Sequence, residues 1–441
     1  MFSNKDLKKL ILPLVVEQFL AVTIGMINTI MVSSCGEAAV SGISLVESIN
    51  FLLVTMFSSI ATGGAVVVAQ FIGKGEKWNA NIAAKQLEFS AFGISLLLCA
   101  FAVIFRDALL QTIFQGIEAD VMANARIYFL LSALSYPSLA VYNSGAALFR
   151  SMGDSKTSMY ISIFMNIIHI IGNTISIYAL NAGVAGVAVA TLITRTVGAV
   201  IITILLLNPN RTVHIDRLRK LEFRPDMIKR IMAIGVPSGL ENSIFQLGKI
   251  LTISIVASFG TVATTANAIG GNIASLQLIP GSAVALALMT VVGQCIGAKD
   301  YEGVKKYVKK LMFFAYAALW GITLIMVLLH KPLLSMYNLS EESLNLTVEL
   351  LIIHVVFSVL IWPFAFALPN ALRAASDAKY TMVVSLATMW LFRIGLSFLL
   401  TRFFHFQIHA IWVAMCIDWF FRAILFIMRF KSGKWKDKAV V

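Results

Sequence analysis

The chain is short of charged residues. They make up 13% of its 441 residues, whereas a soluble protein of this size would carry roughly a quarter. Hydrophobic residues make up 59%. Apolar runs of about 20 residues, the length that crosses the hydrocarbon of a bilayer, recur from one end to the other. We therefore expect an all-α polytopic membrane protein.

Several motifs of enzymes and metal sites are also absent. The sequence contains no HExxH, no plausible Ser/His/Asp set and no Walker loop. Its four cysteines lie far apart without a CxxC pair, and we expect them to act as small hydrophobic side chains. These absences predict a protein that is not an enzyme, has no cofactor and is not powered directly by ATP.

The basic residues are distributed unevenly along the chain. The apolar runs predict helices at about 9–34, 43–72, 84–106, 126–150, 157–180, 183–207, 228–257, 265–297, 308–330, 347–372, 380–402 and 407–430. Most of the 35 Lys and Arg residues lie in alternate connections, among them Arg217, Arg219 and Lys220. The opposite connections hold Arg106, Arg126, Lys331 and Arg402. Because basic loops stay in the cytoplasm, this bias predicts twelve transmembrane helices with both termini cytoplasmic, and it removes nucleic acid as a partner.

The two halves of the chain repeat each other. At an offset of 224 residues Pro13 matches Pro237 and Glu17 matches Glu241, and the turns AQFIGKGE and GQCIGAKD superimpose. At an offset of 223 the turn LFRSMGDSK matches LRAASDAK. Six helices is an even number, so both repeats would enter the membrane in the same direction. We expect two parallel six-helix lobes around a central cavity, at 1–208 and 228–441, with a cytoplasmic linker at 209–227.

One polar turn in each half is the candidate site. Pro237, Glu241 and Lys249 are spaced so that they fall near one face of a helix, and the first half repeats the pattern with Pro13 and Glu17. A carboxylate on an apolar helix is costly in lipid, which makes it a candidate functional group. The neighbouring polar residues are Gln18, Asn242 and Gln246.

The chain resembles the multidrug and toxic compound extrusion (MATE) transporters over essentially its whole length. The resemblance rests on the turns quoted above, on GVAGVAVAT in the sixth helix and on RFKSGKW near the C-terminus. It implies efflux of organic, cationic, amphipathic compounds in exchange for Na⁺ or H⁺. It also implies two lobes that open alternately to each side of the membrane.

The sequence departs from this family at the usual acidic positions. Many members carry an aspartate in the first helix, where this chain has Asn28, and another in the fifth helix, where the nearest match is Asn173. The resemblance therefore implies that cation binding takes place at Glu17 and Glu241 instead.

Two kinds of coupling are open at these carboxylates. Burial disfavours the charged form, so a glutamate could load and release a proton. Alternatively, Na⁺ could bind at Glu17, Asn28 or Glu241, since hard cations take oxygen ligands. Pro13 and Pro237 each free a carbonyl one turn back, which offers a further ligand and a hinge.

Other roles for the same charges remain open. Glu17 could face the lipid headgroups, and Glu241 could form a structural ion pair with Lys249. Asp418 and Arg422, four residues apart, are expected to pair within one helix. Arg393 and Arg195 are expected to contact headgroups or the other lobe, and His169 a backbone carbonyl.

The sequence thus predicts a monomeric efflux transporter of the plasma membrane, in a bacterium the inner membrane. The alternative is a flippase for a lipid-linked or other amphipathic anionic precursor, which would have the same two lobes. That alternative predicts several cations in the cavity to meet phosphates. The sequence offers Lys249 and Arg393 there, against two glutamates.

Overall fold

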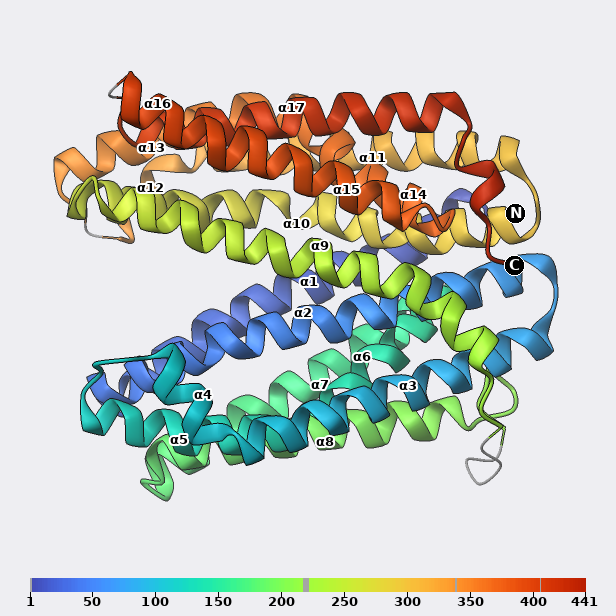
Figure 1. Ribbon diagram of the computed structural model, residues 1–441, viewed down its shortest axis with the longest axis horizontal. Coiled ribbons are helices and arrows are strands. Elements are labelled where there is room, and N and C mark those ends of the chain that lie inside the picture. The colour runs from blue at the N-terminus through green and yellow to red at the C-terminus, as the bar shows by residue number, and fades with distance from the viewer. Residues whose placement is uncertain (1, 217–221, 338, 405) are drawn as a thin grey trace. The chain divides into compact units, whose positions relative to one another are not determined.

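The computed structural model describes residues 2–216, 222–337, 339–404 and 406–441, and within these ranges the chain is helical with no strand (Figure 1). Ten helices of this described part are long and apolar enough to cross a membrane. The α5–α6 pair and α9 complete the twelve predicted spans. Arg217, Arg219 and Lys220 lie outside the described residues.

The first half contains six spans in chain order. They are α1 (Asn4–Ser33), α2 (Glu37–Lys74), α3 (Lys77–Ile104), α5 (Ala119–Leu134) continued by α6 (Tyr136–Ser151), α7 (Ser155–Thr174) continued by η1 (Ile175–Ala179), and α8 (Gly183–Leu206). The short helix α4 (Arg106–Ile113) follows the third span.

The second half has the same order. Its spans are α9 (Pro225–Ala257), α10 (Thr261–Gly297), α11 (Tyr301–Leu328), α13 (Glu341–Trp362) continued by η2 (Pro363–Ala367) and α14 (Leu368–Ala374), α15 (Ala378–Thr388) continued by η3 (Met389–Leu396) and α16 (Ser397–Phe403), and α17 (Ile408–Ser432). The short helix α12 (His330–Ser335) follows the third span here too, and η4 (Lys436–Lys438) lies near the C-terminus.

Several helices begin earlier than the apolar runs predict. α3 begins at Lys77 rather than near 84, and α11 at Tyr301 rather than near 308. Hydropathy reports the hydrocarbon-length part of a helix, whereas backbone hydrogen bonds extend the helix through polar residues beyond it. The starts of α2 and α10 are marked by the repeat-related glycines Gly36 and Gly260, which have φ of 98° and 93°. An L-residue with a side chain rarely adopts such values, so glycine suits both turns.

The chain divides into two compact units. The first unit is Lys8–Gly239, and the second is Leu240–Val441 together with the first residues up to Leu7. The division therefore runs through α1 and α9. Within each unit the long helices run beside one another (Figure 1).

The first part of α9 packs tightly inside the first unit. A Cβ atom on Gly63 of α2 would lie 2.6 Å from the backbone nitrogen of Gly235 and 2.6 Å from the carbonyl oxygen of Ile231. The end of the linker is bonded to α3, because the Gln86 side chain donates to the Glu222 carbonyl at 2.6 Å.

Candidate functional site

Glu17 forms a polar site inside the first unit. α1 continues as a helix through Pro13, and the Glu17 side chain is 14% exposed. Arg150, in the last turn of α6, lies with its Nη1 at 3.2 Å from Oε1 of Glu17. The Ser158 hydroxyl of α7 donates to Oε2 at 3.1 Å. Two helices distant in sequence therefore hold this carboxylate.

Glu241 has the same surroundings inside the second unit. Its side chain is 7% exposed, and Nη2 of Arg373, from α14, lies 2.7 Å from Oε1. The Thr381 hydroxyl of α15 donates to Oε2 at 3.5 Å. Arg373 and Thr381 follow Arg150 and Ser158 at the repeat offset of 223 residues. The two repeats therefore build one three-residue site twice, from a glutamate, an arginine and a hydroxyl.

The two arginines are not apparent from the sequence as partners of the glutamates. Arg150 and Arg373 fall in the predicted cytoplasmic turns, and helix spacing favours Lys249 as the partner of Glu241. That alternative is wrong, because Glu241 pairs with Arg373. The repeat held the missing signal, since both arginines and both glutamates recur at nearly one offset.

The backbone oxygen that Pro13 frees has a partner in the protein. Proline at position 13 removes the amide that would bond the Lys9 carbonyl. The Ser155 hydroxyl lies 3.3 Å from that oxygen and 2.7 Å from the Leu10 carbonyl. Ala378 occupies the repeat-related position in the second half. The Lys9 oxygen is thus held by a hydroxyl and does not serve as a vacant ion ligand.

Asn28 and Asn173 meet inside the first unit. The Asn173 amide donates to the Asn28 side-chain oxygen at 2.8 Å, and the buried Asn173 oxygen has no hydrogen-bond partner among the described residues. An amide pair carries no charge and loads no proton. Proton coupling therefore has to use a carboxylate elsewhere.

The remaining predicted polar residues lie on α1 and α9. Gln18, Asn242 and Gln246 are all half-buried. Lys249 is exposed on its unit, and its ammonium lies over the ring of Phe245 at 5.2 Å from the centroid.

Three charged or polar side chains differ from their expected surroundings. Arg393 lies inside the second unit, 5% exposed, with its Nε 3.4 Å from Asp418. Arg195 donates to the Ser135 hydroxyl at 2.7 Å, at the break between α5 and α6. His169 contacts a hydroxyl, that of Thr191, at 3.2 Å rather than a carbonyl. Helix packing offers these groups partners within their own unit, so they need neither headgroups nor the other lobe. The predicted pair of Asp418 with Arg422 is confirmed, at 3.2 Å.

Two further glutamates lie in the first unit. Glu47 accepts from the Tyr128 hydroxyl at 2.7 Å and from Asn50 at 3.0 Å. Both carboxylate oxygens of Glu88 are shielded and have no hydrogen-bond partner among the described residues. Sequence reasoning misses Glu88, because the apolar run starts the third helix near residue 84. The helix begins at Lys77, which places Glu88 about three turns inside it.

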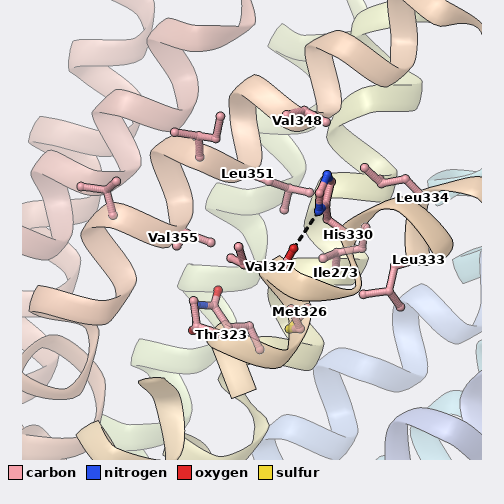
Figure 2. A pocket seen from close by; sticks show the side chains of 13 residues that line it. Ile273, Thr323, Met326, Val327, His330, Leu333, Leu334, Val348, Leu351 and Val355 are labelled. Atoms are coloured by element: carbon pink, nitrogen blue, oxygen red, sulfur yellow. Dashed lines mark hydrogen bonds between the residues drawn. The ribbon is translucent and has the colours of Figure 1, made fainter. Parts of the chain in front are cut away.

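A cavity of about 300 Å³ lies among α10, α11, α12 and α13 of the second unit (Figure 2). Its polar groups bond within the protein. Gln277 donates to Thr323 at 2.6 Å, and Nδ1 of His330 lies 2.7 Å from the Val327 carbonyl. The lining has no carboxylate, lysine or arginine. It can hold an apolar group, but it offers no charge for ion coupling.

Metal-ligating side chains do not cluster within the described ranges. No group of three or more His, Cys, Asp or Glu side chains in them could hold a metal ion. At Glu17 and Glu241 the nearest charged neighbour is an arginine instead.

The sequence is similar to known transporters. The family model MatE matches twice, at residues 13–175 and 237–399, so the predicted repeat is confirmed at its full offset. The uncharacterized transporter YisQ of Bacillus subtilis is 27% identical over 97% of this chain and 94% of its own length. The probable multidrug resistance protein NorM of Thermotoga maritima is 25% identical over 99% and 94%.

Solved structures share the fold. The crystal structure of MATE in complex with MaL6 superimposes with a TM-score of 0.90, at 18% identity, over 98% of this chain and 97% of that one. Two family matches that begin at the two prolines, and a twelve-span architecture common to both, lead to one conclusion: this chain belongs to the MATE family of membrane transporters.

Proposed function

We propose that this protein is a secondary active transporter that exports amphipathic organic compounds in exchange for protons, and that it opens alternately to the two sides of the membrane. The observation that carries the proposal is the repeated site, Glu17 with Arg150 and Glu241 with Arg373. Relatives named as probable multidrug resistance proteins support the substrate class.

A proton fits these sites better than Na⁺. Na⁺ needs several oxygen ligands and would have to lie beside an arginine whose positive charge repels it. A proton needs one carboxylate oxygen. Protonation of Glu17 would neutralise the carboxylate and leave Arg150 without its counter-charge, so the pair would break. A broken pair in one state and a formed pair in the other is the two-state element that coupling requires.

The prolines would act as hinges beside these pairs. Pro13 and Pro237 each lie one turn before the glutamate, where the missing backbone hydrogen bond weakens the helix. A bend there would move Glu17 relative to Arg150. Both helices continue through their prolines in this structure.

We further propose a monomer in the plasma membrane, with both termini cytoplasmic. The uneven distribution of Lys and Arg supports this orientation. A flippase for an anionic lipid precursor is the second candidate, since the cations inside the second unit would suit its phosphates.

The proposal is tested in proteoliposomes with proton and Na⁺ gradients applied separately. Efflux of two dyes of opposite charge, ethidium and carboxyfluorescein, would be followed by fluorescence. We expect a proton gradient to drive at least one dye, and Glu17→Gln to abolish that dependence. Glu349→Gln, which removes an exposed carboxylate paired with His409, is the matched control and should transport normally. Transport driven by Na⁺ alone, or unchanged coupling in Glu17→Gln, would refute the proposal.

A further inference from the structure

The interior of the second unit carries an excess of positive charge around one aromatic ring. Arg393 is 5% exposed and Arg422 3%, and both pair with Asp418, which is fully buried. Lys249 forms no ion pair or hydrogen bond with any residue that the structure describes, and its ammonium contacts the Phe245 ring. Three cations therefore share one carboxylate.

All three cations face Phe245. The ring centroid lies 5.2 Å from Nζ of Lys249, 5.0 Å from Cζ of Arg393 and 5.6 Å from Cζ of Arg422. Cation–π attraction stabilises such contacts by about 0.5–2 kcal/mol each. It does not cancel the repulsion among three like charges in a medium of low dielectric.

Hydrogen bonding within the cluster is also incomplete. The buried Nε atoms of Arg393 and Arg422 have no hydrogen-bond partner among the described residues. Arg422 does donate through Nη2 to Asp418 and to the Ser385 carbonyl, both at 3.2 Å. Donors of Arg393 and Lys249 are left over, and charged residues inside membrane helices that lack partners are functional candidates.

The fold itself does not require this cluster. The repeat-related position of Phe245 is Ala21, and that of Lys249 is Gly25, on the same turns of α1. The counterpart of Arg393 is Ile170. The first half therefore builds the same helices with small or apolar side chains at these three positions. A structural role would predict a similar set of residues in both halves.

We propose that Lys249, Arg393 and Phe245 form a subsite for the anionic oxygen group of an aromatic, amphipathic substrate. A carboxylate, sulfonate or phosphate would accept the unused donors of the two cations, and the attached aromatic system would stack on Phe245. The inference rests on the proposed function and gives its substrate class. It assigns the export substrate an anionic group, in place of the positive charge that the family resemblance implies.

The test is equilibrium binding to the purified full-length protein in a non-ionic detergent, with no ion gradient. The probe is carboxyfluorescein, followed by fluorescence anisotropy, and ethidium is the cationic comparison. We expect saturable carboxyfluorescein binding that Lys249→Gln weakens about tenfold, the loss of one charge-assisted hydrogen bond. Lys249→Arg should stay within about threefold of the native chain. Lys331→Gln, which removes an exposed lysine of α12, should bind normally.

Competition separates two sources of the anionic group. A soluble naphthalene sulfonate and a short-chain phosphatidic acid would each be titrated against bound carboxyfluorescein. Stronger displacement by the sulfonate supports a free organic anion, and stronger displacement by the phosphatidic acid supports a lipid headgroup at the same subsite. Lys249 is exposed on its unit and has no ion pair among the described residues, so Lys249→Gln leaves no buried charge unpaired.

Two results would overturn the inference. One is an absence of saturable carboxyfluorescein binding, and the other is equal affinity in Lys249→Gln and the native chain. Neither result depends on coupling. Proton-driven export with no anion binding would refute the subsite alone, whereas anion binding without proton-driven export would refute the proposed coupling alone.

Discussion

The buried pair of Glu241 and Arg373 makes a quantitative prediction about stability. Nη2 of Arg373 lies 2.7 Å from Oε1 of Glu241, and the side chains are 13% and 7% exposed for the arginine and the glutamate. Removal of one partner from such a pair leaves an uncompensated charge and costs about 3–5 kcal/mol. Arg373→Met also removes the hydrogen bond at 2.8 Å to Asn370, so we place this variant near the upper end of that range.

The double variant separates the pair from its parts. Glu241→Gln with Arg373→Met carries no buried unpaired charge, so more than half of the lost stability should return. The assay is the thermal midpoint of the purified protein in one detergent. A loss of this size lowers the midpoint by roughly 10 °C for a unit of about 200 residues. Because membrane proteins often unfold irreversibly, the variants are compared at one scan rate.

An exposed ion pair supplies the control. Lys305 and Glu302 lie 2.8 Å apart with 52% and 82% of their side chains exposed, and such pairs contribute about 0–1 kcal/mol. Lys305→Met should therefore leave the midpoint nearly unchanged. The reasoning fails if Arg373→Met melts with Lys305→Met, or if the double variant is no more stable than Arg373→Met.

Two further predictions follow from packing and burial in the first unit. Gly63→Ala should lower the yield of monodisperse protein sharply, because its Cβ would meet the Gly235 backbone at 2.6 Å; Gly25→Ala, at a position with open space, is the control. Equal yields on size-exclusion chromatography would contradict this. Glu88→Gln should raise the thermal midpoint by a few degrees, since it removes a shielded carboxylate that lacks a hydrogen-bond partner among the described residues. A lower midpoint would show that Glu88 has a stabilising counter-charge.

Hydropathy and the repeat were readable from the sequence because both are local or periodic. Apolar runs of hydrocarbon length predicted the spans, and Pro13 and Pro237 marked equivalent turns of two repeats. The family match begins at these same two residues. The positions of Asn28 and Asn173 could also be predicted as a pair, and the structure brings them to 2.8 Å.

The tertiary structure decided which charges meet. Arg150 lies 133 residues from Glu17 along the chain, and no local pattern links them. Whether a charge near a helix end faces lipid, water or a partner depends on how neighbouring helices pack, which hydropathy does not report. The cluster around Phe245 likewise joins side chains from α9, η3 and α17. The sequence alone could therefore predict the spans and the candidate glutamates, but only packing could pair those glutamates with arginines and gather three cations at one ring.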